Sequence, residues 1–223
     1  MNELRGLTLV SVIIADDHDL VRAGISRMLA DVSHIQVVGE ANSGEQALEL
    51  VKKLHPDVVL MDVKMPGIGG LEATRKVLKQ APGTKVIILT VCEEEPFPSK
   101  CLRAGAAGYL TKGAALNEVV SAIDTVSRGQ RYVSPEIAQL LALRSFSDGG
   151  ESPFDQLSER ELQVAMMIVE CKKVQEISDT LFLSPKTINT YRYRVFDKLG
   201  VSSDVELALL AVRHGMIDAS TPA

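Results

Sequence analysis

Short apolar runs rich in β-branched residues alternate with helical periods in the first part of the chain. The runs cover residues 9–15, 35–40, 58–61, 86–89 and 108–110. Apolar runs of this length, separated by amphipathic segments, predict strands joined by helices. Ser43 with Gln46 marks the start of the second helix, and Pro56 follows its end. The pattern therefore predicts an α/β domain with a doubly wound parallel sheet.

A different pattern begins after residue 128, where no further strand is predicted. A helix is predicted over residues 134–144. Residues 145–153 are rich in Ser, Gly and Asp and contain little that could be buried, which is typical of a linker.

The remaining residues show only helical periodicity. Ser158, Ser184 and Ser203 each begin a predicted helix, and the apolar run 174–183 adds another. Four short helices predict a small all-α domain. The expected parts are the α/β domain at 1–128, a linker with one helix at 129–154, and the all-α domain at 155–223.

Composition narrows the class of protein. The chain has 223 residues and a net charge of -5, so any nucleic-acid binding has to depend on local clustering of basic residues. Cys92, Cys101 and Cys171 form no Cys-x-x-Cys pair, and we expect buried thiols rather than disulfides or a zinc site. No apolar run approaches the roughly 20 residues of a membrane helix, and the first residues lack a secretion pattern. We therefore expect a cytoplasmic protein that does not bind a membrane.

Polar side chains follow successive strands of the predicted sheet. Asp16 and Asp17 end the first strand, Asp62 the third and Thr90 the fourth, and Lys112 follows the fifth. The carboxyl ends of parallel strands share one edge, so these side chains should converge. Grouped carboxylates suit Mg²⁺, and Asp62, which lies centrally, is the natural nucleophile for a phosphoryl group. Each residue alone would more readily be explained as a helix cap, a surface charge or part of a turn, but the full set in this order favours a site.

Three segments of the first domain resemble the receiver domain of response regulators: residues 16–18, 58–67 and 105–112. The resemblance covers about residues 9–128 and implies a flavodoxin-like (βα)5 fold. It implies that Asp62 accepts a phosphoryl group from the phosphohistidine of a sensor histidine kinase.

The same resemblance assigns roles to the neighbouring residues. Asp17, Asp62 and the main-chain carbonyl of Lys64 would hold Mg²⁺, with Asp16 acting mostly through water. Thr90 and Tyr109 would form a switch pair, in which the hydroxyl moves to the phosphoryl group and the ring follows it inward. Lys112 would bind a phosphoryl oxygen.

The segment after the fourth strand departs from the common receiver pattern. Residues 93–95 are three acids, and Pro96 and Pro98 follow them. Proline lacks an amide proton and restricts the residue before it, so the next helix should start late, near Ser99. We hypothesise that phosphorylation shifts the population of this helix.

The second domain contains a helix-turn-helix pattern, with helices at 174–183 and from Ser184 onward. On the second helix, Ile188, Tyr191, Val195 and Leu199 share one face that should pack inward. The opposite face is rich in polar and basic residues, suited to the major groove and to phosphates. The candidate DNA-binding residues are Lys186, Thr187, Asn189, Thr190, Arg192, Tyr193, Arg194 and Lys198.

Residues 157–161 and 176–201 resemble the LuxR-type helix-turn-helix of NarL/FixJ-family response regulators, over about residues 155–217. With residues 67–76 and 184–194, the whole chain resembles the GacA/UvrY/SirA group. That resemblance implies a hybrid sensor kinase of GacS/BarA type as partner and activation of genes for small regulatory RNAs. The last helix, 203–216, carries more apolar surface than a small domain needs, which indicates either a homodimer face or core packing.

Two other readings of the acidic pocket remain open. An aspartyl-phosphate phosphatase would need a second acid two residues after Asp62, where this chain has Lys64. A regulator that binds DNA independently of phosphorylation would not need the pocket. We therefore expect no enzyme activity beyond stoichiometric self-phosphorylation and slow loss of the phosphoryl group.

Overall fold

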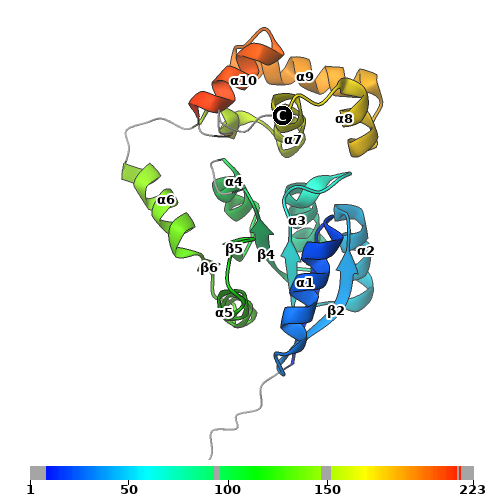
Figure 1. Ribbon diagram of the computed structural model, residues 1–223, viewed down its shortest axis with the longest axis vertical. Coiled ribbons are helices and arrows are strands. Elements are labelled where there is room, and N and C mark those ends of the chain that lie inside the picture. Colours follow the sequence, from blue (N-terminus) through cyan, green and yellow to red (C-terminus); the bar gives the residue numbers. More distant parts are fainter. Residues whose placement is uncertain (1–8, 93–95, 147–151, 215, 217–223) are drawn as a thin grey trace, which may run out of the picture.

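The computed structural model describes residues 9–92, 96–146, 152–214 and 216. Within these ranges the chain forms an α/β domain and a helical domain (Figure 1). The acids at 93–95 and most of the predicted linker, 147–151, lie outside the described residues.

The α/β domain is built on a parallel sheet with the strand order β2-β1-β3-β4-β5-β6. The strands are β1 (Val10–Ala15), β2 (Ile35–Ala41), β3 (Val58–Met61), β4 (Lys85–Thr90), β5 (Gly108–Thr111) and β6 (Tyr132–Val133). The first five agree with the predicted runs to within a residue at each end. Strands β1, β3 and β4 are almost continuously buried, as expected for strands covered on both faces.

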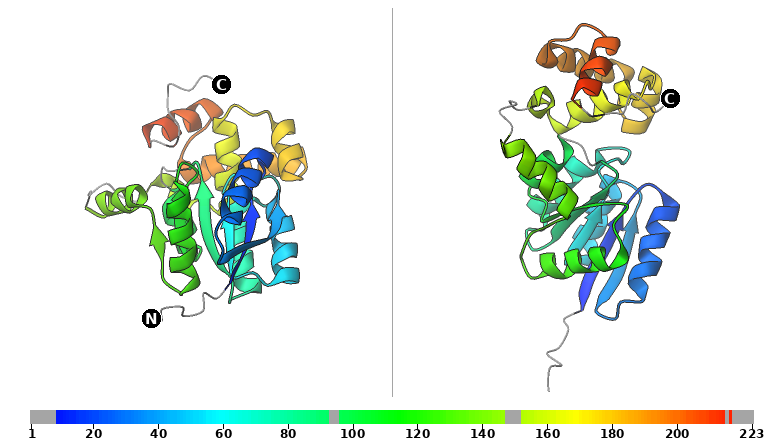
Figure 2. Two further views of the ribbon diagram at one scale, coloured as in Figure 1. Left: turned by 60° about the horizontal axis from the view of Figure 1, so that its bottom comes forward. Right: turned by 60° about the vertical axis from the view of Figure 1, so that its left-hand side comes forward.

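Helices cover both faces of this sheet (Figure 2). They are α1 (Asp19–Ala30), α2 (Gly44–Leu54), α3 (Gly69–Gln80), α4 (Phe97–Arg103) and α5 (Leu116–Ser127). Helices α1 and α5 bury side chains such as Leu29 and Ile123 on one face, and α2, α3 and α4 bury side chains such as Val51 and Val77 on the other. Ser43 caps α2 by accepting a hydrogen bond from the amide of Gln46. The doubly wound architecture is confirmed.

A sixth strand was not predicted. Tyr132 and Val133 pair with Gly108 and Tyr109 of β5, so a segment expected to be linker extends the sheet. A Cβ atom at Gly108 would lie 3.2 Å from the carbonyl oxygen of Tyr132, so glycine allows this close pairing. Two residues are too few to give a period-2 signal.

Helix α4 starts at Phe97, earlier than the predicted Ser99. Pro98 lies in the first turn, where an amide proton has no helical partner in any case. The helix therefore begins two residues before the predicted position, because proline is tolerated in the first turn.

The helical domain follows α6 (Pro135–Phe146), which was predicted over 134–144. Its elements are the 3₁₀ helix η1 (Pro153–Gln156), α7 (Glu159–Val169), α8 (Val174–Leu181), α9 (Pro185–Leu199) and α10 (Asp204–Arg213). Ser158, Ser184 and Ser203 accept hydrogen bonds from amides three residues on, so all three predicted caps are confirmed. Ser158 and Glu161 form a full capping box.

The prediction of buried thiols is confirmed for two cysteines and wrong for the third. Cys92 and Cys101 are buried, but Cys171, which follows α7 with a φ of 60°, is exposed. It lies in the bend between α7 and α8 rather than on the apolar face of a helix.

No helix in the described ranges has the length and apolar character needed to span a bilayer.

Helix α7 lies on the side of the helical domain that faces the α/β domain, and α9 lies farther from the α/β domain (Figure 1). Leu162 and Met166 of α7 belong to the same buried apolar cluster as Met65 and Phe97 of the α/β domain. The two domains are therefore in close contact.

Candidate functional site

The carboxyl edge of the sheet gathers the residues predicted from the strand ends. The Lys112 ammonium lies 2.7 Å from the Asp16 carboxylate and 2.7 Å from the Asp62 carboxylate. Asp16 and Asp62 are each 2% exposed, so both charges are held away from water. The predicted convergence is therefore present, with Asp62 at its centre.

Burial and pairing act in opposite directions on these groups. Burial raises the pKa of Asp62 above its ordinary value, and the hydrogen bond and charge of Lys112 oppose that shift. Burial works to lower the pKa of Lys112, but its bonds to Asp16 and Asp62 outweigh this and raise it. Lys112 is therefore held as a cation against two buried carboxyl groups.

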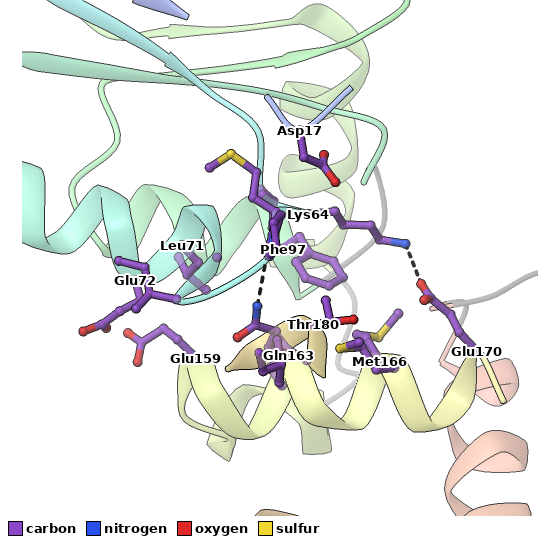
Figure 3. A pocket seen from close by; sticks show the side chains of 18 of the residues that line it. Asp17, Lys64, Leu71, Glu72, Phe97, Glu159, Gln163, Met166, Glu170 and Thr180 are labelled. Atoms are coloured by element: carbon purple, nitrogen blue, oxygen red, sulfur yellow. Dashed lines mark hydrogen bonds and ion pairs between the residues drawn. The ribbon is translucent and has the colours of Figure 1, made fainter. Parts of the chain in front are cut away.

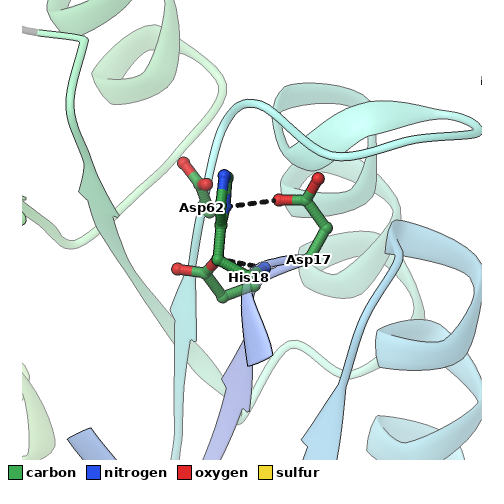
Figure 4. Close-up of side chains that lie close together, drawn as sticks. Asp17, His18 and Asp62 are labelled. Atoms are coloured by element: carbon green, nitrogen blue, oxygen red, sulfur yellow. Dashed lines mark hydrogen bonds and ion pairs between the residues drawn. The ribbon is translucent and has the colours of Figure 1, made fainter. Parts of the chain in front are cut away.

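The acidic side chains are close enough to share a metal ion. Asp16, Asp17, His18 and Asp62 each offer a ligand atom, and all four atoms lie within 4.8 Å of one another (Figure 4). Three carboxylates form a hard oxygen donor set that suits Mg²⁺. The residues present therefore fit this cation.

His18 is the member of this group that the sequence reasoning did not assign to the site. Its Nδ1 lies 3.1 Å from the Asp16 carboxylate and 3.0 Å from the Asp17 carboxylate. The signal was its position directly after the paired acids. Asp17 is about one-third exposed, which leaves it accessible from solvent.

The loop after Asp62 folds back tightly against it. The amide of Lys64 donates to Asp62 Oδ1 at 3.3 Å, and the amide of Gly70 donates to the carbonyl of Val63. A Cβ atom at Gly70 would lie 1.7 Å from the Asp62 carbonyl oxygen, so only glycine fits. The Lys64 backbone is therefore beside the acidic cluster, while its side chain points to Glu170.

Thr90 and Tyr109 are both fully buried beside the site. A hydrogen bond from Thr90 works to lower the pKa of Asp62, so the hydroxyl is already directed to the carboxylate. The Tyr109 hydroxyl donates to the Cys92 carbonyl. The ring of Tyr109 is therefore held inside the domain, and its pairing with Thr90 as a switch stays a prediction.

Helix α9 presents the predicted recognition surface at its N-terminal end. Lys186, Thr190, Tyr193 and Arg194 are exposed, and Thr187 and Asn189 are half-buried. On the opposite face, Ile188 and Val195 are fully buried, with Tyr191 and Leu199 packed against the core. The predicted division into an inner and an outer face is present.

Two predicted DNA contacts also have partners inside the helical domain. The guanidinium of Arg192 lies 2.7 Å from the Asp204 carboxylate and over the Phe196 ring. The ammonium of Lys198 lies 2.6 Å from the buried carboxylate of Glu161. Both side chains join helices of the domain and are also partly exposed, so each stays a predicted DNA contact.

Comparisons with known proteins match each of the two domains to a known family. Residues 12–124 match the response regulator receiver domain, and residues 155–211 match the bacterial regulatory proteins of the luxR family. The response regulator GacA of Pseudomonas syringae pv. syringae (strain B728a) is 67% identical over 213 residues, covering 95% of this chain and 100% of that protein. The response regulator UvrY of Escherichia coli (strain K12) is 56% identical over 214 residues, covering 96% of this chain and 98% of UvrY.

Solved structures extend the likeness to the whole fold. RcsB from Salmonella enterica serovar Typhimurium, bound to promoter P1flhDC in the presence of the phosphomimetic BeF3-, matches with a TM-score of 0.67 at 28% identity. The match covers 91% of this chain and 98% of RcsB. The chain belongs to the GacA/UvrY group of DNA-binding response regulators of two-component systems.

Proposed function

We propose that Asp62 is the phosphoacceptor and that its phosphorylation controls DNA binding by the helical domain. The observation that carries this proposal is the Lys112 ammonium, 2.7 Å from both Asp16 and Asp62 at the carboxyl edge of the sheet. A carboxylate oxygen of Asp62 attacks the phosphorus, a P–O bond forms, and the P–N bond to the donor histidine breaks with its electron pair remaining on the imidazole. Lys112 and the Thr90 hydroxyl then bind phosphoryl oxygens.

The acidic cluster would hold Mg²⁺ for this step. Asp17, Asp62 and the main-chain carbonyl of Lys64 would coordinate it, with Asp16 acting through water. When bound, Mg²⁺ supplies positive charge that offsets both the clustered carboxylates and the phosphoryl oxygens. Thr90 and Tyr109 would form the switch pair that couples the phosphoryl group to the α4 side of the sheet.

Helix α9 would enter the major groove. Asn189 would bind base edges, together with Thr190 and Tyr193, while Lys186, Thr187 and Arg194 would contact phosphates. The RcsB structure bound to a promoter supports a DNA-bound form for a protein of this architecture. Half-sites suit a homodimer, and the exposed Val205 and Leu209 of α10 offer it an apolar face.

The resemblance to GacA and UvrY supports a more specific role. The protein would receive its phosphoryl group in the cytoplasm from a hybrid sensor kinase of GacS/BarA type and activate genes for small regulatory RNAs. A footprint on genomic DNA with and without phosphorylation tests this role. Binding sites that do not change on phosphorylation would support a regulator that binds DNA independently of phosphate.

Incubation with acetyl phosphate and Mg²⁺ tests the phosphoacceptor. We expect one phosphoryl group per chain, slow to leave, and none on the Asp62→Asn variant. Continuous release of phosphate at enzymatic rates would favour a phosphatase, and labelling of Asp62→Asn would contradict the assignment.

A further inference from the structure

The loop that follows Asp62, residues 63–69, is covered by helices α7 and α8 (Figure 3). The Gly67 amide donates to the Thr180 carbonyl at 3.0 Å, and Arg160 Nη1 donates to the Gly67 carbonyl at 2.5 Å. Gln163 Nε2 lies 3.4 Å from the carbonyls of Met65 and Gly67. The main chain of this loop is therefore bonded directly to the DNA-binding domain.

An ion pair extends this contact toward the phosphoacceptor. The Lys64 ammonium lies 2.9 Å from the Glu170 carboxylate, at the end of α7. Burial works to lower the pKa of Lys64, but the hydrogen bond to Glu170 and the charge of Asp62 help to raise it. Lys64 is two residues from Asp62, so the DNA-binding domain makes charged contact beside the reacting carboxylate.

A cavity of about 340 Å³ lies between the two domains. Phe97, Leu162 and Met166 belong to its apolar lining, and Asp17 and His18 of the acidic cluster belong to its polar lining. Sites for whole small molecules start at roughly 300 Å³, so this space can hold a small phosphodonor.

A second anchor holds the domains together away from the acidic cluster. The Lys100 ammonium, on α4, donates to the main-chain carbonyls of Asp155 and Leu157 at 2.8 and 2.6 Å. Burial lowers the pKa of Lys100, as expected for a cation enclosed at an interface. The two domains are thus held together both at the loop after Asp62 and at α4.

The position of α9 indicates whether the docked arrangement of the two domains restrains DNA binding or phosphorylation. Helix α9 makes no substantial contact with the receiver among the described residues, and Lys186, Tyr193 and Arg194 stay exposed. The contact therefore covers the surroundings of Asp62 rather than the recognition surface.

We propose that the DNA-binding domain selects phosphodonors by size: small donors reach Asp62 while the domains are docked, and a protein donor reacts only after the DNA-binding domain leaves loop 63–69. A phosphohistidine on a protein has to approach Asp62 with its surrounding surface, and that surface needs the space that α7 occupies. The rate with a protein donor then scales with the fraction of open molecules, and the rate with a small donor does not. This inference rests on the proposed function of Asp62.

The test compares two donors with the same P–N bond on the full chain with Mg²⁺: phosphoramidate and a phosphorylated histidine phosphotransfer domain. Glu170→Gln and Gln163→Ala weaken the docking, and Gln163→Ala leaves Lys64 in place. We expect each to raise the protein-donor rate about twofold to fivefold, as a partly exposed contact allows, with an unchanged phosphoramidate rate. Asp197→Asn, which removes an exposed acid on α9, is the matched control and should change neither rate.

A covalent cross-link between the two domains should lower the protein-donor rate instead of raising it. Arg75 Nη1 and Glu159 Oε1 lie 3.8 Å apart across the two domains. In a Cys171→Ser background, Arg75→Cys and Glu159→Cys place thiols on these two facing positions, and a cleavable bifunctional thiol reagent spans the wider gap between the shorter side chains. We expect transfer from the protein donor to stop, labelling by phosphoramidate to continue, and cleavage to restore transfer.

Two outcomes would overturn the inference: equal acceleration with both donors, which would indicate altered chemistry at Asp62, and undiminished protein transfer in the cross-linked chain. In both cases Asp62 would still be labelled, so the proposed function would stand. Failure of both donors to label Asp62 would instead refute the proposed function.

Discussion

The ammonium of Lys64 and the carboxylate of Glu170 lie 2.9 Å apart and join the loop after Asp62 to the end of α7. Both side chains are partly exposed, so the pair stabilises the docked arrangement by no more than about 1 kcal/mol. Docking therefore depends on several modest contacts. An arrangement of this kind can open without unfolding either domain.

Hydrogen exchange at the Gly67 amide reports this opening, because its acceptor is the Thr180 carbonyl of the other domain. We expect Glu170→Gln to speed Gly67 exchange up to about fivefold. The Asp62 amide, bonded to the Ala15 carbonyl within the sheet, should be unaffected. Unchanged Gly67 exchange in Glu170→Gln would show that the ion pair does not contribute to docking.

Lys112→Gln should slow phosphorylation by phosphoramidate roughly tenfold to hundredfold, because a hydrogen bond to a charged group contributes about 1.5–3 kcal/mol. The substitution also leaves Asp16 and Asp62 without their cation, so Mg²⁺ should stabilise this variant against heat more than the parent chain. Lys79→Gln, at an exposed position on α3, is the control. Single-turnover kinetics that match the control would remove Lys112 from the site.

Glu161→Gln should lower the free energy of unfolding of the helical domain by about 1–3 kcal/mol. Burial works to raise the pKa of Glu161, but Lys198 and Ser158 outweigh it and lower the pKa. The carboxylate therefore stabilises the fold fully above its ordinary pKa, and this stabilisation disappears as the pH falls through the lowered value.

Thermal melts from pH 7 to pH 3 check this expectation. The parent domain should lose stability more steeply than Glu161→Gln at the acidic end. Asp197→Asn is the control, because Asp197 is an exposed acid on α9 of the same domain. Parallel pH profiles for the parent and Glu161→Gln would contradict the prediction.

Arg194 and Lys198 should differ in DNA binding although both are basic residues of α9. Arg194→Gln is expected to weaken binding to all sequences and to lower the salt slope by about one. Lys198→Gln should leave the slope unchanged and reduce thermal stability, because Lys198 pairs with Glu161. An equal change of slope in both variants would show that Lys198 contacts DNA phosphates as Arg194 does.

Asn189→Ala should relax sequence preference instead. A bidentate contact with a base distinguishes it from the others by about 1–3 kcal/mol, and phosphate contacts do not. Competition between specific and random duplexes measures the difference. Equal losses on the two duplexes would remove Asn189 from base recognition.

The strands and caps could be predicted because their signals are local. Val58–Met61 is a continuous buried run, and Ser158, Ser184 and Ser203 each cap a helix through an amide three residues away. The two-residue strand β6 could not be predicted, since it forms only by pairing with β5. The start of α4 was misplaced because a proline in the first turn was taken as a barrier.

The site could be predicted as far as strand order brings residues together. Asp16, Asp62 and Lys112 converge because their strands end at one edge of the sheet. The partners of Lys64, Arg192 and Lys198 depend on how helices pack, and periodicity along a single helix does not contain that information. The contacts between the two domains therefore could not be predicted from the sequence.

Cys171 can be used to follow the separation of the two domains. It directly follows Glu170, it is exposed, and the chain's two other thiols, Cys92 and Cys101, are buried. A fluorophore attached there would stand beside the carboxylate that binds Lys64. The unmodified chain thus already carries a labelling point from which domain separation can be followed in real time, before and after phosphoryl transfer.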